Sequence, residues 1–177
     1  MKDNKILYKG FHSIEQILIN LKGKERTFER LKMNSAVAAI VTDIHGKIGI
    51  VKQLRPCVSE ITYEIPAGMI DKPNKSDKEI LIEELEEECA INRSDIIYFS
   101  ENPLHKYYML CGSSDAEISI YRVKLKSKEK NKIVHDMDVS SVEWITFNEL
   151  EQLVQTGQLT DAKTLIAYFC LKNEYFK

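Results

Sequence analysis

The sequence predicts an α/β protein in which helices cover a mixed β-sheet. Short segments with the apolar or alternating pattern of strands lie on both sides of one central segment with helical spacing. Two further segments with helical spacing follow close to the C-terminus. Strands before and after a central helix, with helices at the end, are the order expected of an α/β sandwich.

The length and composition fit one globular domain. The 177 residues are close to the roughly 150 that are typical of a domain, and 44% of them are hydrophobic. A formal net charge of -2, without a sustained run of Lys and Arg, argues against a nucleic-acid partner. Because no apolar run approaches the roughly 18 residues that predict a membrane helix, we expect no membrane partner either.

The cysteines indicate a reducing compartment. Cys57, Cys89, Cys111 and Cys170 lie far apart and lack the C-x-x-C spacing of zinc or redox sites. Three of them stand in apolar or element-like surroundings, which predicts buried thiols. Since the N-terminus also lacks the apolar core of a signal peptide, we expect a cytoplasmic protein.

The N-terminal region, residues 1–34, is predicted to form antiparallel strands. Residues 5–31 alternate weakly between apolar and polar side chains, and Lys22-Gly23-Lys24 is typical of a tight turn. This pattern predicts two or three strands arranged as a hairpin layer. Residues 35–177 form the second part of the chain, a mixed α/β domain.

Strand and helix signals alternate through residues 35–177. A turn at His45-Gly46 separates two strands, and Pro66 and Gly68 break a third. Ser76 or Asp77 caps the central helix, and Gly157 ends the next one. The expected strands are 35–43, 47–56, 62–68, 95–104, 116–125 and 140–147, and the expected helices are 77–90, 148–157 and 161–176.

The central helix carries six glutamates in ten residues, within the segment EILIEELEEECAI (79–91). On a helical wheel Glu84, Glu87 and Glu88 share one face, because positions i, i+3 and i+4 are neighbours. A neighbouring apolar arc that faces a core consists of Leu81, Ile82, Leu85 and Cys89. The glutamates expected to face solvent are Glu79, Glu83 and Glu86.

Three carboxylates on one face need a counter-cation or raised pKa values. Oxygen ligands without a soft partner favour Mg²⁺, or Mn²⁺, over zinc. A backbone carbonyl at Ala67-Gly68 is a further candidate ligand, since glycine permits a close approach of the main chain. The spacing alone also fits a solvated acidic helix face, so the choice depends on the segments upstream.

Those segments resemble a known family. Residues 64–91, EIPAGMIDKPNKSDKEILIEELEEECAI, are similar to the Nudix box, G-x5-E-x7-R-E-U-x-E-E-x-G-U, in which U is apolar. VKQLRP, TYEIPAG and YYMLCGSSD resemble segments of the ADP-sugar and UDP-sugar pyrophosphatase branch. The resemblance extends from about residue 36 to the C-terminus. It implies the Nudix fold, an α/β/α sandwich around a mixed sheet, with N-terminal strands that build a homodimer.

The chain departs from the box pattern at three places. Gly68 lies one residue too far upstream, so the loop carries one extra residue. Ala90 replaces a glycine, which is tolerable if its backbone stays helical. Glu83 stands where the family keeps arginine, and Lys75 where it keeps glutamate. We therefore expect a Lys75–Glu83 pair of reversed polarity that holds the loop against the helix; the alternative is an unpaired lysine in a loop.

The resemblance also implies the roles of individual residues. Glu84 and Glu88 become the principal metal ligands, with Glu87 and the carbonyl of Ala67 as additional ligands for Mg²⁺. Arg55 becomes a contact for the diphosphate or ribose, with a structural salt bridge as the alternative. Glu64 matches a glutamate of the family that contacts the substrate or the metal.

The general base stays open among several acids. Asp136 and Asp138 lie in VHDMDVSSVEW, where the branch often carries an acidic residue on a late loop, and Glu117 follows YYMLCGSSDA. Glu87 completes the set of catalytic candidates. The resemblance thus predicts Mg²⁺-dependent hydrolysis of a nucleotide sugar, ADP-ribose first and UDP-sugars second, to a nucleoside monophosphate and a sugar phosphate. The alternative is a non-catalytic Nudix-like module that binds nucleotide sugars as a sensor.

Overall fold

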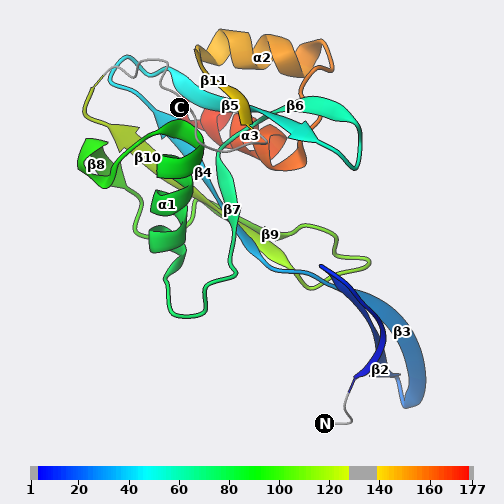
Figure 1. The fold of residues 1–177 in the computed structure, drawn as a ribbon. Coiled ribbons are helices and arrows are strands. Elements are labelled where there is room, and N and C mark those ends of the chain that lie inside the picture. The colour runs from blue at the N-terminus through cyan, green and yellow to red at the C-terminus, as the bar shows by residue number, and fades with distance from the viewer. Residues whose placement is uncertain (1–3, 128–138, 176–177) are drawn as a thin grey trace.

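A mixed β-sheet with helices on both faces forms the body of the protein, and a smaller sheet projects from it as an arm (Figure 1). The computed structural model describes residues 4–127 and 139–175. The expected α/β/α sandwich is therefore confirmed. Both sheets and all helices named below belong to these described residues.

The arm consists of three antiparallel strands in the order β1-β2-β3. Their bounds are β1 (Lys5–Lys9), β2 (Ser13–Leu21) and β3 (Lys24–Lys32). The β2–β3 register runs from Ser13 opposite Lys32 to Leu21 opposite Lys24, which leaves Lys22 and Gly23 as a two-residue turn. Both turn residues have positive φ, 53° and 81°, as the tightest hairpin turns require. The predicted hairpin layer and its turn are confirmed.

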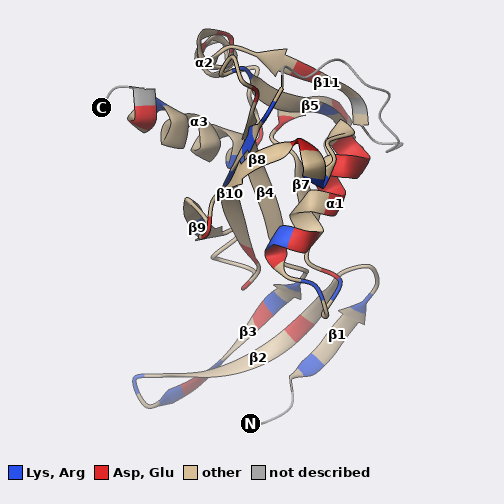
Figure 2. Cartoon of the chain, turned by 90° about the vertical axis from the view of Figure 1, so that its left-hand side faces the viewer, with Lys and Arg blue, Asp and Glu red and all other residues tan. Residues whose placement is uncertain are grey.

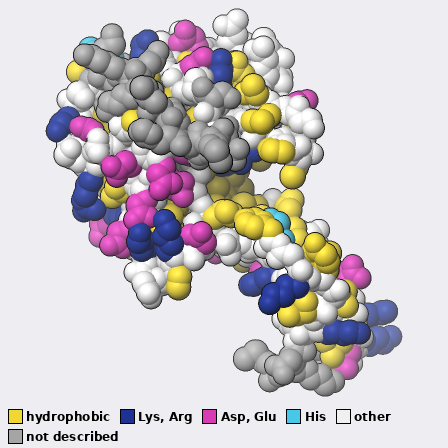
Figure 3. Space-filling model, viewed as in Figure 1, with side chains coloured by type: hydrophobic (Ala, Val, Ile, Leu, Met, Phe, Trp, Pro, Cys, Tyr) yellow, Lys and Arg dark blue, Asp and Glu magenta, His cyan; other side chains and the backbone are white. Residues whose placement is uncertain are grey.

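The arm is tied to the body at its base. The Leu31 N–H donates a hydrogen bond to the Ser113 carbonyl at 2.8 Å. Arg30 bridges the two parts, because its guanidinium contacts Asp115 of the body at 2.7 Å and Glu15 of the arm at 2.9 Å. Beyond this base the arm extends away from the helices and exposes several large apolar side chains (Figures 1 and 3).

The main sheet follows the order β11-β5-β4-β10-β8, and β6, β7 and β9 pair with β5, β4 and β10. Its strands are β4 (Ala36–Thr42), β5 (Ile48–Arg55), β6 (Glu60–Glu64), β7 (Ala67–Met69), β8 (Ile96–Phe99), β9 (His105–Tyr108), β10 (Glu117–Leu125) and β11 (Val139–Ile145). Strands β4 and β10 are parallel, whereas the other strand pairs described in this sheet are antiparallel, so the sheet is mixed as predicted.

Two apolar clusters hold the layers together. Helix α1 (Asp77–Cys89) packs Leu81 and Leu85 against one face of β4, β5, β10 and β11. Helices α2 (Phe147–Gln155) and α3 (Ala162–Tyr175) pack Leu150 and Leu171 against the other face. Because side chains alternate along each strand, β4 contributes side chains to both clusters, and its central residues are buried.

Local signals explain the ends of α1. The Ser76 side chain accepts a hydrogen bond from the Glu79 N–H, and the Glu79 carboxylate accepts one from the Ser76 N–H, which forms a capping box. Glu79, expected to be merely solvated, therefore caps the helix. At the other end Ala90 has φ +52°, the left-handed conformation. The condition of a helical backbone at Ala90 is therefore not met; Ala90 occupies the position after the helix where glycine costs least.

Two short elements and two thiols differ from expectation. Strand β9 and the 3-10 turn η1 (Arg93–Asp95) were not predicted from the sequence, because four or fewer residues give no clear periodicity. The expectation of buried thiols holds for Cys89, whereas Cys57 and Cys111 are exposed, since both lie in loops. No helix among the described residues is long and apolar enough to cross a membrane.

Candidate active site

The centre of the candidate site is the contact between α1 and the short strand β7. Strand β7 follows Pro66 and pairs with β4, with Ala67 opposite Ala38. The Ala67 N–H donates a hydrogen bond to the Glu88 carboxylate at 3.2 Å. Only 2% of Glu88 is exposed, so this carboxylate is held in the interior at the end of a strand. Buried carboxylates are ordinarily paired with a cation or bound to a metal ion.

Gly68 brings the second glutamate to the same strand. An added Cβ at Gly68 would lie 2.1 Å from Cγ and Cδ of Glu84 and 2.2 Å from its Oε1. Real Cβ atoms essentially never come this close to other atoms, so the Glu84 carboxylate occupies space that only glycine leaves open. Glu84 and Glu88 are one turn apart on α1, and both therefore face β7.

Glu87 lies differently from these two residues. It is exposed, whereas Glu84 is half-buried and Glu88 is buried. Its charge acts on Lys72 in the loop before α1. Figure 2 shows the acidic residues of α1 in red along the helix, but across residues 4–127 and 139–175 no three His, Cys, Asp or Glu side chains are arranged to hold a metal ion. The structure thus brings Glu84 and Glu88 to β7 and leaves Glu87 at the surface.

The donors at this contact fit a hard divalent cation. They are two carboxylates and the main chain of β7, which offer oxygen and no sulfur or imidazole. Mg²⁺ binds through one or two carboxylates and keeps several waters, so it does not require a closed cage of protein ligands. Glu84, Glu88 and the Ala67 carbonyl are therefore the residues that would hold such an ion.

The loop between β7 and α1 is fixed by Glu83. Its carboxylate forms ion pairs with Lys72, at 2.8 Å, and with Lys75. These contacts hold the pKa of Glu83 below its ordinary value, through the hydrogen bonds from Lys72 and then Lys75. The predicted Lys75–Glu83 pair is confirmed, and Lys72 is a second partner that the sequence analysis missed.

Arg55 and Glu64 form a two-pronged ion pair at the end of β5 and β6. Arg55 donates from Nε at 2.6 Å and from Nη2 at 2.5 Å to the two oxygens of Glu64. The hydrogen bond with Glu64 raises the pKa of Arg55, and the charges of Asp161 and Glu88 add to this effect. Arg55 therefore lies within electrostatic range of the α1–β7 contact, and in this structure it makes the salt bridge that the sequence analysis gave as the alternative.

Glu64 is nearly buried, with 3% of its side chain exposed. Burial acts to raise its pKa, but hydrogen bonds from Arg55, Lys163 and Thr62 outweigh burial and hold the pKa at about 2. The Glu64 carboxylate is therefore ionised at neutral pH. Because its hydrogen-bonding capacity is directed at side chains of the protein, its role here is to hold other residues.

Helix α3 brings to this site residues that were not predicted from the sequence. Lys163 contacts Glu64, and the Thr164 hydroxyl accepts the Ile65 N–H at 2.8 Å. Asp161 caps the helix, because its carboxylate accepts the Thr164 N–H at 2.9 Å. A lysine in the first turn of α3, just before its apolar stretch, was the available signal, but its partner lies 99 residues away in the sequence.

The remaining catalytic candidates are placed as follows. Glu117 begins β10, its N–H donates to the Ser35 hydroxyl at 3.1 Å, and its carboxylate pairs with Lys106 at 2.5 Å. Strand β4 separates Glu117 from β7 in the sheet. Asp136 and Asp138 lie outside the described residues.

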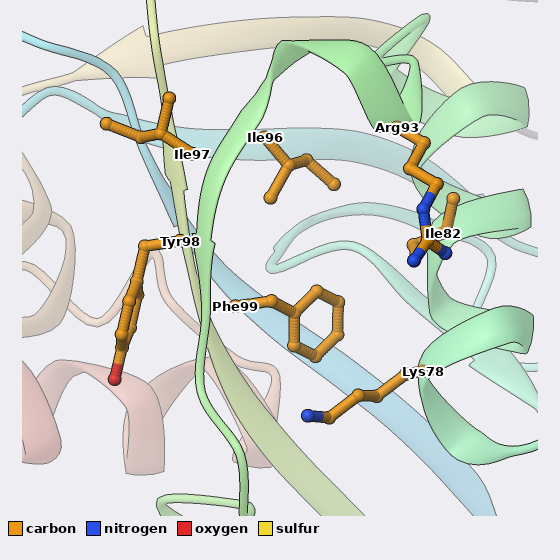
Figure 4. A pocket seen from close by; sticks show the side chains of 7 residues that line it. All are labelled: Lys78, Ile82, Arg93, Ile96, Ile97, Tyr98 and Phe99. Atoms are coloured by element: carbon orange, nitrogen blue, oxygen red, sulfur yellow. The ribbon is translucent and has the colours of Figure 1, made fainter.

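A separate cavity of about 300 Å³ lies between α1 and β8 (Figure 4). Its charged lining residues are both cationic, and the Lys78 ammonium lies 5.3 Å from the centre of the Phe99 ring. None of the predicted site residues lines it. The lining residues are Lys78, Ile82, Arg93, Ile96, Ile97, Tyr98 and Phe99.

Comparison with known proteins agrees with this geometry. The chain matches the NUDIX domain over residues 32–168. It is 29% identical over 147 residues to an ADP-ribose pyrophosphatase of Bacillus subtilis (strain 168). This alignment covers 82% of this chain and 76% of the relative. It is 30% identical over 150 residues to a methanol dehydrogenase activator of Bacillus methanolicus, with the same coverage of 82% and 76%.

The chain therefore belongs to the NUDIX family of hydrolases. Within the family its likeness is to the ADP-ribose pyrophosphatase type. Members of the family generally use divalent metal ions such as Mg²⁺, which agrees with the oxygen donors at the α1–β7 contact.

The Glu83 ion pairs yield a charge-reversal prediction. Glu83→Lys places a third cation beside Lys72 and Lys75 and should lower kcat/KM about tenfold, because the loop that carries β7 into α1 loses its anchor. Lys75→Glu should have a smaller effect, since Lys72 still pairs with Glu83. Combining both changes restores one ion pair and should recover most of the loss, as measured by steady-state kinetics.

Glu86→Lys is the matched control, because it makes the same charge change at an exposed position of the same helix. It should leave kcat/KM within about twofold of the parent chain. A double variant as impaired as Glu83→Lys would show that the ion pair does not orient the loop.

Proposed function

We propose that this chain hydrolyses the diphosphate bond of a nucleotide sugar, releasing a nucleoside monophosphate and a sugar phosphate. ADP-ribose is the first substrate and UDP-sugars are the second. The observation that supports this most is the pair Glu84 and Glu88, which α1 directs at the glycine and the backbone amide of β7. The likeness to an ADP-ribose pyrophosphatase supports the choice of substrate.

The proposed cofactor is Mg²⁺, with Mn²⁺ as an alternative. Glu84, Glu88 and the Ala67 carbonyl would hold it, and Glu87, three residues along α1 from Glu84, is proposed as an additional ligand. A divalent ion bound there neutralises charge on the diphosphate and lowers the pKa of a bound water. The carboxylates Glu84 and Glu88 carry the negative charge that such an ion requires.

The chain's own residues supply binding and proton transfer. Arg55 presents a guanidinium, which suits two-pronged contact with phosphate oxygens, and 43% of its side chain is exposed. Glu64 lies beneath it and sets its orientation. The proton acceptor for the attacking water is proposed among Glu87, Glu117, Asp136 and Asp138. Of the two that the structure describes, Glu87 is exposed, whereas Glu117 would first have to release Lys106.

A second proposal is a regulatory role, in which the chain binds nucleotide sugars as a sensor without turnover. The relative named methanol dehydrogenase activator favours it, since that name describes an effect on another enzyme. In both proposals the chain acts in the cytoplasm on a small molecule, and neither nucleic acid nor membrane is a partner. Turnover distinguishes the two.

The substrate panel tests these proposals. The chain is incubated with Mg²⁺ and ADP-ribose, UDP-glucose, GDP-mannose, NADH or a diadenosine polyphosphate, and released monophosphate is measured. Monophosphate should appear fastest from ADP-ribose and should require the divalent ion. Glu84→Gln and Glu88→Gln should each lower kcat by at least about 100-fold, because a neutral amide binds Mg²⁺ poorly.

Far-UV circular dichroism of both variants serves as the control for folding. Product formation that is unaffected by EDTA or by either substitution would contradict the metal site. Binding of a nucleotide sugar without any product would favour the sensor.

We also propose that residues 1–34 form the contact of a homodimer and that residues 35–177 form the hydrolase domain. The arm exposes large apolar side chains on a sheet that covers no core of its own: Ile6, Leu7, Tyr8, Phe11, Leu18, Ile19, Leu21 and Phe28. Ile19 and Phe28 line a hollow of about 280 Å³ between the arm and residues 111–115. Exposed apolar surface of this kind is typical of an interface.

Sedimentation velocity tests the dimer. The chain, of 20.5 kDa, should sediment as a species of twice that mass at micromolar concentration. Ile19→Lys and Phe28→Lys together should shift it to the monomer, because buried lysines without partners oppose association. Ile97→Lys is the control and should leave the dimer intact, because Ile97 is apolar and even more exposed than Ile19 and Phe28 but lies on β8 of the body. A monomeric parent chain would contradict the proposal.

A further inference from the structure

Arg55 and Lys163 share one buried carboxylate. Both carboxylate oxygens of Glu64 accept hydrogen bonds from the Arg55 guanidinium. Its Oε2 also accepts one from the Lys163 ammonium, and its Oε1 accepts one from the Thr62 hydroxyl at 2.5 Å. A single carboxylate thus neutralises two cations, and Asp161 supplies the second negative charge through Lys163 at 3.1 Å. The four charged groups form one network between β5, β6 and the start of α3.

The two cations differ in how freely they can move. The Arg55 side chain is 43% exposed and extends from the end of β5, where it meets solvent. The Lys163 side chain is 10% exposed and lies between Glu64 and Asp161. Only Arg55 can therefore exchange its partner for a ligand without leaving a buried cation behind.

Lys163 is fixed by the start of α3. The Asp161 carboxylate accepts hydrogen bonds from the Thr164 N–H at 2.9 Å and from its hydroxyl at 2.5 Å, which sets where the helix begins. Thr164 in turn accepts the Ile65 N–H, so the helix is joined to the residue after Glu64. Lys163 is thus held against Glu64 independently of Arg55.

We propose that Lys163 is a positioning residue that makes Arg55 available to the substrate. When Arg55 turns to a phosphate oxygen of the diphosphate, Glu64 keeps Lys163 and Thr62 as partners and is not left as an unpaired buried charge. Without Lys163, Glu64 depends on Arg55 for its charge compensation, and the guanidinium stays bound to it. This inference rests on the proposed function, because it assigns the diphosphate to Arg55.

The test compares Lys163→Met with Lys163→Arg in the full chain. Lys163→Met should raise KM for ADP-ribose about tenfold and leave kcat within about threefold, because binding is lost and not the chemical step. Lys163→Arg keeps the charge and should keep the parent KM. Adding Glu64→Gln to Lys163→Met removes the charge that retains Arg55 and should bring KM back toward the parent value.

Lys172→Met is the matched control, since Lys172 lies on the same helix and also forms an ion pair, with Glu151 at 2.9 Å. It should leave KM unchanged. If Lys163→Met does not fold, Lys163→Gln keeps a hydrogen-bond donor to Glu64 without the charge, and the same rise in KM is expected.

Calorimetric titration with inorganic pyrophosphate in EDTA measures the same effect without turnover, and Lys163→Met should bind about tenfold more weakly than the parent chain. A parent chain that turns over ADP-ribose, with KM and pyrophosphate binding unchanged in Lys163→Met, overturns this inference alone. No rescue in the double variant also overturns it, because Lys163 would then act only in folding. A parent chain that neither turns over the panel nor binds pyrophosphate overturns both this inference and the proposed function.

Discussion

The close approach of α1 to β7 is the constraint on which the site depends. Glycine at position 68 removes the one side-chain carbon that would collide with Glu84, and the adjacent amide holds Glu88. Neither carboxylate would be directed at a main-chain segment if β7 lay an ångström or two further away. The capping box at Ser76 and the buried Leu81 and Leu85 fix the rotation of α1, so that the glutamates and not its exposed face meet the strand.

Ion pairs hold both ends of the segment that contains β7, one set at the surface and one in the interior. In the loop that leads from β7 to α1, Lys72 and Lys75 form ion pairs with Glu83 of the helix. Ion pairs at the surface contribute little stability, but these two restrict the position of the loop. The strand that leads into β7 is pinned from inside by Glu64, Lys163 and Thr164. Both ends of the segment 65–76 are therefore anchored, one to α1 and the other to α3.

Local sequence signals were sufficient for much of this. The helix α1 could be predicted because capping, apolar spacing and length agree within about fifteen residues, and the arm because its turn and alternation are local. The pair Lys75–Glu83 could be predicted only through the resemblance to the Nudix box, in which these two positions carry a pair of opposite polarity. The helix register also placed Glu84 and Glu88 on one face, although it could not show that Glu87, one residue away, is exposed.

Long-range contacts account for what could not be predicted. Lys163 and Glu64 are 99 residues apart, and no periodicity connects a lysine at a helix start with a strand residue. The left-handed Ala90 follows from how α1 must turn to bury Ile91, which the residue type alone does not reveal. Arg55 could be singled out for its chemistry, whereas its pairing with Glu64 required the alignment of β5 beside β6.

Gly68→Ala tests the central claim most directly. The atoms that a Cβ would meet belong to the flexible side chain of Glu84, so the fold should survive while the carboxylate moves away from β7. Gly112→Ala is the matched control, because a Cβ there meets nothing within 4 Å. We expect Gly68→Ala to lower kcat/KM for the best nucleotide-sugar substrate by roughly 100-fold, with its circular dichroism spectrum unchanged. Full activity in Gly68→Ala would contradict the account, because the position of Glu84 against β7 would then not matter to function.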